Sequence, residues 1–411
     1  MSLVGAVPLL GRPAKLTIRD LEIWRLEGRR ETPAGVDTQH QVRPLHIYEE
    51  HRPKPYRDQP RPEMRIVPIS AYYLKIRSDA GIDGVYGPID KEAAIVVDQQ
   101  IRGLLTGKDA LAGETLWDQM HRLNRHSSRG LFMMGISAVD NALWDLRGRY
   151  FETPVYRLLG GPTRSRVEAY GSCLGFSVEP EAMRSKCVEL KGQGFRNQKW
   201  FLAYGPGDGA DGLAKNVELV RGLREALGDG VEIMFDAFMG WDLAYAISWA
   251  KRVEAYRPRW IEEAFAVEKI ESFAALRRAT SIPVASGEHF YSRWHAHEYL
   301  KAGAITVVQA DPEWCGGVSE LVKICSLGSL YDVQVIPHGH SLHAALHVVA
   351  SQPPMTCPLV EYLISKMRSY YFFEKRQLRP EQGKIELPEH PGFGIEWEPA
   401  RVDKQTLQRW N

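Results

Sequence analysis

Short apolar runs alternate with helical patterns over residues 164–354 of this chain. The runs are rich in β-branched and aromatic residues, as in VEIMFDAF, RWIEEAF, IPVASGEHF, AITVVQADP and VQVIPHGH. Segments between them, such as DLAYAISWAKRVEAY and GVSELVKICSLGSLYD, place apolar residues at helical spacing. Because parallel strands need long crossover connections, which are usually helices, this repetition predicts an α/β fold with a parallel sheet.

The regions on either side have different patterns. AYYLKIRSDAGIDGVYGPI alternates apolar and polar residues around a Gly/Asp turn, which predicts a β-hairpin. The polar stretch before it, residues 29–65, is rich in Pro, His and Arg and lacks periodicity, so we interpret it either as a lid over a site or as a disordered segment. GISAVDNALWDLRGRYF has helical spacing, and the chain becomes irregular after the strand-like run LVEYLI.

One titratable residue stands at the end of each strand-like run: Asp236, Glu262, Glu288, Asp311, His338 and Glu361. Successive members are 26, 26, 23, 27 and 23 residues apart, about the length of one strand–helix unit of a barrel. If the sheet closes into an eight-stranded barrel, all six side chains emerge at the rim where barrel enzymes place their sites. The spacing therefore predicts a site at the carboxyl ends of the strands.

Three of these residues, Asp236, Glu262 and Glu288, follow consecutive strands. Converging carboxylates repel one another without a cation. An all-oxygen set favours Mg²⁺, with Mn²⁺ as a substitute, over zinc. The alternative is that each carboxylate caps the following helix, where negative charge is favourable. Three carboxylates in step with the strands favour the metal site.

The other rim residues suggest proton transfer. An aspartate beside a histidine orients the imidazole and stabilises its charged form, so Asp311 would support His338 as a base near neutral pH. Lys199, near the end of the earlier run FRNQKWF, would stabilise negative charge if it is buried, or would be a surface lysine. Glu361 is a candidate acid, a hydrogen-bond donor to substrate, or a structural residue.

The segment VIPHGHSLHAALHVVA holds four histidines and resembles a metal cluster at first sight. His343 and His347 are four residues apart and share a helix face as a zinc pair would. No glutamate of an H-E-x-x-H motif lies between them, however. We therefore interpret both as ordinary helix residues, His340 as a candidate substrate contact, and His338 as the proton carrier.

The composition is that of an ordinary globular protein: 411 residues, 44% hydrophobic, 25% charged, net charge +1. Such a balance favours neither nucleic acid nor an anionic membrane as a partner. No apolar run is long enough to predict a membrane span. The five cysteines are scattered and form no C-x-x-C pair, which is typical of a reducing compartment. We expect a cytoplasmic protein that acts on a small molecule.

In their order and spacing, the motifs FDAF, WIEE, SGEH, QADPEWCGG and IPHGHS resemble the mandelate racemase subgroup of the enolase superfamily. QKWFLAYGPGDG and WCGG are similar to sugar-acid dehydratases of the L-rhamnonate dehydratase type. The resemblance implies a modified (β/α)8 TIM-type barrel, residues 136–363. It also implies an α+β capping domain formed by residues 1–135, which carry a specificity loop, and by the returning segment 364–411. Mg²⁺ bound by Asp236, Glu262 and Glu288, and a homo-oligomeric assembly, are further implications.

The resemblance also implies a reaction: proton abstraction next to a carboxylate that is bound to Mg²⁺, through an enediolate. Racemases of the subgroup carry Lys-x-Lys on the second barrel strand, whereas this chain has Lys199 and then Phe201, so one of two bases is missing. His338 alone can remove the α-proton and protonate the leaving β-hydroxyl, which favours dehydration of a sugar acid to a 2-keto-3-deoxy acid.

An epimerase, racemase or cycloisomerase is the alternative within the superfamily. A barrel that only binds a ligand is disfavoured, because such a protein would be free to lose its carboxylates. The resemblance places substrate selection in the cap, and the candidate substrate-binding residues are Arg61, His289 and His340.

Overall fold

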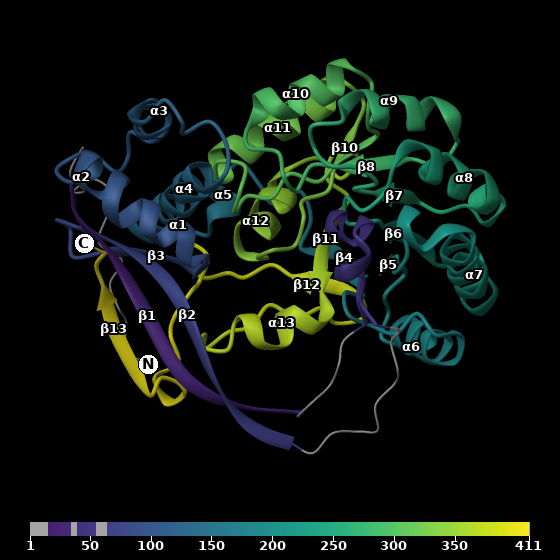
Figure 1. Cartoon of the computed structure of the whole chain (residues 1–411). Coiled ribbons are helices and arrows are strands. Elements are labelled where there is room, and N and C mark those ends of the chain that lie inside the picture. The colour runs from purple at the N-terminus through teal and green to yellow at the C-terminus, as the bar shows by residue number, and fades with distance from the viewer. Residues whose placement is uncertain (1–14, 34–38, 55–63, 411) are drawn as a thin grey trace.

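The computed structural model describes residues 15–33, 39–54 and 64–410. It contains a four-stranded antiparallel sheet and, beside it, a curled parallel sheet surrounded by helices (Figure 1). The predicted α/β fold, with a parallel sheet and a separate α+β region, is confirmed.

The antiparallel sheet belongs to the cap and draws its strands from both ends of the chain. Its order is β13 (Lys404–Gln408), β1 (Ile18–Pro33), β2 (Met64–Ser78) and β3 (Asp83–Ile89). The predicted hairpin is confirmed, because β2 and β3 pair antiparallel across the Gly/Asp turn. β13 pairs with β1, so the returning segment completes this sheet.

The polar stretch 29–65 is not irregular throughout. Arg29–Pro33 continues β1, and Met64 and Arg65 begin β2, with Arg29 opposite Pro68 and Pro33 opposite Met64. The sequence pattern did not indicate these two strand ends, because the backbone hydrogen bonds that pair the strands do not require apolar side chains. Between them the structure describes two 3-10 turns, Pro44–Ile47 and Glu49–His51.

The helices of the cap follow β3: α1 (Lys91–Val96), α2 (Arg102–Leu105), α3 (Gly113–Leu123) and α4 (Leu131–Tyr150), with a π-helical turn at Val97–Ile101. The predicted stripe of α4 is buried: Ile136, Val139, Leu143 and Leu146 are each at most 1% exposed. The boundary expected at residue 135 falls inside this helix.

α4 joins the cap to the barrel. On the cap side, the Asp145 carboxylate accepts a hydrogen bond from the Val85 amide at 2.7 Å. A side chain at Gly84 would lie 2.4 Å from the Ala142 carbonyl oxygen, so glycine permits this close approach of strand and helix. On the barrel side, Asn141 donates from Nδ2 to the Pro312 carbonyl at 3.0 Å. The helix thus fixes the loop that carries Asp311.

The eight parallel strands run in the order β10 (Gln334–Val335), β9 (Val307–Val308), β8 (Val284–Ser286), β7 (Trp260–Glu262), β6 (Glu232–Asp236), β5 (Asn197–Phe201), β4 (Arg166–Ser172) and β11 (Leu359–Leu363). A short strand, β12 (Lys384–Glu386), pairs antiparallel with β4. Seven side chains that share one interior cluster fill the curled sheet: Tyr170, Met234, Trp260, Ala285, Val307, Ile336 and Leu359. The interior is a packed core, as in other barrels of this size.

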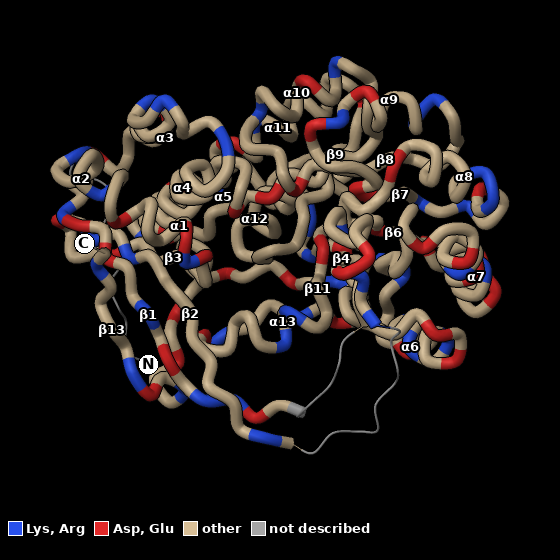
Figure 2. Tube along the Cα trace, viewed as in Figure 1, with Lys and Arg blue, Asp and Glu red and all other residues tan. Residues whose placement is uncertain are grey.

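The helices of the barrel are α5 (Val155–Leu158), α6 (Pro180–Gly192), α7 (Gly209–Leu227), α8 (Leu243–Val253), α9 (Ile270–Ala279), α10 (Arg293–Lys301), α11 (Val318–Leu330) and α12 (His343–Ser351). A further helix, α13 (Ile364–Tyr370), follows β11 where an irregular segment was expected. Both charge signs are interspersed on helices such as α6 and α7 (Figure 2), in keeping with the net charge of +1.

In the described ranges, no helix combines the length and apolar character needed to cross a membrane. All five cysteines are buried and free.

Candidate active site

Five of the six predicted rim residues lie at or just past the carboxyl ends of their strands, and Glu361 lies within its strand. Asp236 and Glu262 are the last residues of β6 and β7, and Glu288 lies two residues past β8. Asp311 and His338 lie three residues past β9 and β10, whereas Glu361 is the central residue of β11. All six are buried.

Lys199 on β5 is buried among carboxylates, so it is not a surface lysine. Its Nζ lies 3.2 Å from Asp236 Oδ2 and 2.9 Å from Glu361 Oε1, and it also donates to Glu262 Oε1. Burial opposes its charge, but Glu262 and Glu361 hold the pKa of Lys199 well above its usual range. The Phe201 ring, two residues along the same face, lies 5.3 Å from Nζ. In the metal-free protein, Lys199 is therefore held as a cation by the carboxylates around it.

The carboxylates predicted as metal ligands are desolvated. Burial is the largest cause that raises the pKa of Asp236 to about 6, of Glu262 to about 8 and of Glu288 to about 7. One oxygen of Asp236 accepts from the Phe238 amide at 2.8 Å, and one of Glu262 accepts from Trp260 Nε1 at 2.9 Å. Lys199 alone offsets only part of this negative charge. A buried, all-oxygen donor set with excess negative charge fits a hard divalent cation.

Glu288 also belongs to a second group. One ligand atom each of Glu263, Glu288 and His289 lies within 4.8 Å of the others. His289 Nδ1 is 3.0 Å from Glu263 Oε1, and although burial would lower the pKa of His289, Glu263 raises it to about 9. Glu263 was not predicted. A protonated imidazole has no free lone pair, so in the metal-free protein Glu263 and Glu288 are the ligands that this group offers.

His338 and Asp311 form the predicted pair. His338 Nδ1 is 2.7 Å from Asp311 Oδ2. The other ring nitrogen of His338, Nε2, points toward Glu288 and lies 3.7 Å from Glu288 Oε2. Burial alone would lower the pKa of His338, but Glu288 and the hydrogen bond to Asp311 raise it to about 10. Asp311 is itself held, because its Oδ1 accepts from the Glu313 amide at 2.6 Å. The imidazole therefore presents Nε2 toward the carboxylates.

Glu361 is an ionised acceptor in this arrangement. Burial would raise its pKa, but Lys199 and His338 lower the pKa of Glu361 to about 2. Its Oε2 accepts from the Gly339 amide at 2.9 Å, next to His338. Of the alternatives left open by the sequence, this geometry favours an anionic anchor over a proton donor.

The loop after β9 contributes a residue that the sequence did not indicate. The Trp314 ring lies 5.1 Å from His338, 5.0 Å from His340 and 5.5 Å from His289, measured between ring centroids. The WCGG motif was noted for its resemblance only, and aromatic packing between loops leaves no periodic signal in a sequence.

Three of the eight non-glycine residues with positive φ in the described part of the chain lie beside the carboxylates. Phe238 and Met239, just after β6, have φ of 48° and 58°, and Glu263, just after β7, has φ of 43°. Such left-handed conformations cost about 1–3 kcal/mol each at residues other than glycine. The Met239 amide donates to the Glu263 carbonyl at 2.6 Å, so the two loops hold each other in this conformation.

A segment of the cap lies over the same rim. The Gln39 amide donates to the Gly175 carbonyl at 3.1 Å, and the Val42 amide donates to the Leu202 carbonyl at 2.8 Å. A side chain at Gly240 would lie 2.6 Å from Val42 Cγ2, so glycine is needed where this segment meets the loop after β6. Arg61, the predicted substrate-binding arginine, lies outside the described residues.

His343 and His347, the two histidines of α12, are structural. His343 Nε2 lies 2.9 Å from Glu374, and His347 Nδ1 accepts from the Tyr156 amide at 3.1 Å.

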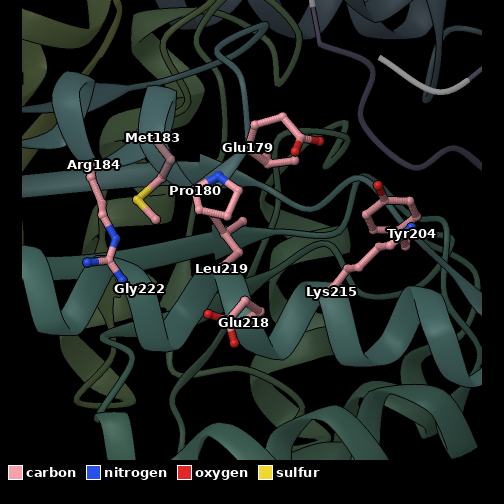
Figure 3. A pocket seen from close by; sticks show the side chains of 10 residues that line it. Glu179, Pro180, Met183, Arg184, Tyr204, Lys215, Glu218, Leu219 and Gly222 are labelled. Carbon is pink, nitrogen blue, oxygen red and sulfur yellow. The ribbon is translucent and has the colours of Figure 1, made fainter. Parts of the chain in front are cut away.

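A separate pocket of about 290 Å³ lies between α6 and α7, where Met183, Arg184 and Lys215 are among its lining side chains (Figure 3). None of the predicted site residues lines it.

Comparisons with known proteins agree with this architecture. Residues 182–401 match the family described as Enolase C-terminal domain-like, and residues 69–160 match the Mandelate racemase / muconate lactonizing enzyme, N-terminal domain. L-rhamnonate dehydratase from Saccharopolyspora erythraea is 30% identical over 370 residues, which are 88% of this chain and 90% of that protein. D-galactarolactone cycloisomerase from Agrobacterium fabrum is 31% identical over 340 residues, 79% of this chain and 88% of that protein.

A crystal structure of rhamnonate dehydratase from Gibberella zeae complexed with Mg is 27% identical, with a TM-score of 0.78 over 96% of this chain and 97% of that one. The chain therefore belongs to the mandelate racemase / muconate lactonizing enzyme family of the enolase superfamily. It is an enzyme of that superfamily, as the motifs implied.

Proposed function

We propose that this enzyme is a Mg²⁺-dependent dehydratase of sugar acids that yields a 2-keto-3-deoxy acid. The observation that carries the proposal is the presence of one base only. His338 is oriented by Asp311 and presents Nε2, whereas the second-base position holds Phe201 and the neighbouring Lys199 is paired with Glu361. Relatives named L-rhamnonate dehydratase support this reaction class.

The proposed ligands of the cation are Asp236, Glu262 and Glu288. When bound, Mg²⁺ would neutralise negative charge that develops on the substrate carboxylate and would cancel the charge of Glu288. The Glu288 carboxylate raises the pKa of His338, so cancelling its charge brings the imidazole back toward neutrality, where it can take a proton.

In the proposed reaction, His338 Nε2 removes the proton from the carbon next to the carboxylate. The same imidazolium then protonates the β-hydroxyl as it leaves as water, on the same face. Asp311 keeps the ring oriented, Lys199 offsets negative charge at the strand ends, and Glu361 holds the Gly339 amide beside His338. His289, His340 and Arg61 stay predictions as substrate contacts, as do a homo-oligomeric assembly and a cytoplasmic location.

A screen of monoacid and diacid sugars with Mg²⁺, read out as 2-keto acid, tests the reaction. We expect at least one sugar acid to lose water and His338→Asn to abolish that loss. No 2-keto acid from any of these sugars would contradict the proposal.

Adjacent glutamates give a matched test of the ligand set. Glu262→Gln removes a proposed ligand, and Glu263→Gln changes the same chemistry one residue away. We expect calorimetry to show Mg²⁺ affinity weakened at least tenfold in the first variant and much less in the second. A larger loss of Mg²⁺ affinity in Glu263→Gln than in Glu262→Gln would instead assign the cation to the group of Glu263, Glu288 and His289.

A second candidate is cycloisomerisation, favoured by the 31% identity to a D-galactarolactone cycloisomerase. That reaction also needs a single base, so the site alone does not separate the two. Product mass does, because a cycloisomerase changes a lactone without losing water. An isomeric product of unchanged mass, formed from a lactone and not from any free sugar acid, would favour this candidate.

A further inference from the structure

A second polar network adjoins the His338–Asp311 pair and has no part in the reaction described so far. It joins three segments that are far apart in the sequence: Asp90 after β3, His340 after β10 and Lys366 in α13. Lys366 Nζ donates to the His340 carbonyl oxygen at 2.8 Å and lies 2.8 Å from the Nδ1 of the same residue. The lysine therefore holds both the backbone and the ring of His340.

The backbone of His340 leads directly to the proton-transfer pair. Its amide donates to Asp311 Oδ2 at 3.1 Å, and this is the oxygen that also lies 2.7 Å from His338 Nδ1. The backbone of His340 therefore contacts the same carboxylate oxygen that orients His338.

The contact with Lys366 fixes the tautomer of His340. An ammonium group has donors and no acceptor, so Nδ1 of His340 must accept. The ring proton of a neutral imidazole then stands on Nε2, which faces Asp90 Oδ1 at 3.5 Å and, within the described residues, forms no hydrogen bond. Burial and the nearby Lys366 both lower the pKa of His340, in keeping with a neutral ring.

Asp90 departs from the role that its position predicts. It occupies the N-cap of α1, where an aspartate side chain normally accepts from a backbone amide of the first turn. Here no such bond forms, and the carboxylate faces His340 instead. The cap forgoes one helix-capping bond where it meets the barrel.

Lys366 is likewise not explained by an ordinary ion pair. Within the described part of the chain, Lys366 Nζ forms no ion pair with a carboxylate, and burial lowers the pKa of Lys366 to about 8. Its helix is fixed to the cap, because Tyr370 Oη donates to the Pro88 carbonyl at 2.9 Å. Within the same helix, Lys366 Nζ lies 4.3 Å from the centroid of the Tyr370 ring.

We propose that Lys366 and Asp90 are positioning residues for proton transfer: they hold His340 in one tautomer and one place, and His340 in turn holds the Asp311 carboxylate that orients His338. The inference rests on the proposed function in assigning proton transfer to His338. It adds that the cap and the C-terminal segment set the geometry of the base.

Deuterium exchange at the imidazole C2 of His340, followed against pH by mass spectrometry with fragmentation, tests the network in the ligand-free protein. Three charged groups face His340: Lys366 from α13, Asp90 from the cap and Asp311 from the loop after β9. Removing the cation in Lys366→Met should raise the midpoint of exchange, and removing the anion in Asp90→Asn should lower it. General loosening would move both midpoints toward the ordinary value of 6.5.

Turnover of the sugar acid found by screening supplies the second readout. We expect Lys366→Met to lower kcat and α-proton exchange in deuterated water together, by about 10- to 100-fold, because misplacement of a reacting group by about 1 Å costs this much. KM and Mg²⁺ affinity should change less than about threefold, since Lys366 is neither a proposed ligand of the cation nor a proposed substrate contact. The control is Lys323→Met, which loses an exposed pair with Glu114.

Shifts of opposite sign at His340 together with reduced proton removal support the inference. Equal or absent shifts, or wild-type kcat in both variants, overturn it. Asp90→Asn is nearly isosteric and keeps the inference testable if Lys366→Met does not fold. If the wild-type enzyme acts on no sugar acid, the proposed function fails, whereas the His340 midpoints still decide the arrangement of the network.

Discussion

Replacing Lys199 with methionine should cost the metal-free enzyme a large share of its stability. The side chain is 1% exposed and contacts Asp236, Glu262 and Glu361, so the substitution leaves three buried carboxylates without their cation. Removing one partner of a buried ion pair costs about 3–5 kcal/mol, because the other charge stays buried. Domains are typically stable by only about 5–15 kcal/mol, so the urea midpoint should fall markedly.

The cost should depend on pH. The pKa of Asp236 is about 6 and that of Glu262 about 8 with the lysine present, and both rise further without it. At pH 5 these carboxyls take up protons and no longer need a counter-charge, so the variant should approach the wild type more closely than at pH 8. Urea unfolding in the presence of a chelator, followed by circular dichroism at both pH values, measures this difference.

Lys323→Met is the matched control, since its pair with the exposed Glu114 is worth at most about 1 kcal/mol. Equal losses of stability in the two lysine variants at pH 8 would refute the role of Lys199 as a buried counter-ion. A loss at pH 5 as large as at pH 8 would refute the link to the carboxylates.

Three further outcomes are expected. His338→Asn should abolish exchange of the substrate α-proton in deuterated water while Mg²⁺ binding, measured by calorimetry, persists; retained exchange would remove His338 as the base. Burial raises the pKa of Asp236, Glu262 and Glu288 above their unfolded values of 3.8 to 4.5, so their protonated forms favour folding at low pH. The metal-free enzyme should therefore lose stability from pH 5 to pH 8, and saturating Mg²⁺ should flatten this slope in thermal melts. Trp314→Leu should lower kcat/KM about tenfold, which corresponds to a rise of about 1.4 kcal/mol in the activation free energy, with unchanged Mg²⁺ affinity. An unchanged kcat/KM would show that the ring contacts of Trp314 do not contribute to catalysis.

The rim residues could be predicted because a barrel repeats one physical unit. Each buried strand is followed by a helix of similar length, so Asp236, Glu262 and Glu288 recur in step with the apolar runs. The strand-by-strand order of the parallel sheet follows from the same repetition. Lys199 and Phe201 share a face because side chains alternate along a strand. The resemblance to racemases with Lys-x-Lys on this strand identified Phe201 as the place of the missing base.

Contacts between distant segments could not be predicted in this way. Asp90 Oδ1 and His340 Nε2 lie 3.5 Å apart although the two residues are far apart in the sequence. No local sequence pattern around either residue indicates that they are in contact. α13 was missed because ISKMRSY buries only Ile364 and Met367, too few for a helical stripe. Glu263 follows Glu262 directly, and only the left-handed backbone after β7 brings it toward His289.

The place of α13 and β13 after the strands of the parallel sheet has a consequence for protein synthesis. Strands β6 to β8, which carry the carboxylates, leave the ribosome well before Lys366 and before β13 can pair with β1. Under the proposed arrangement, a nascent chain can gather its acidic residues early, but the loop bearing His338 is secured only by segments that are made later. A growing polypeptide would thus acquire the means to bind a cation before it acquires a well-placed base.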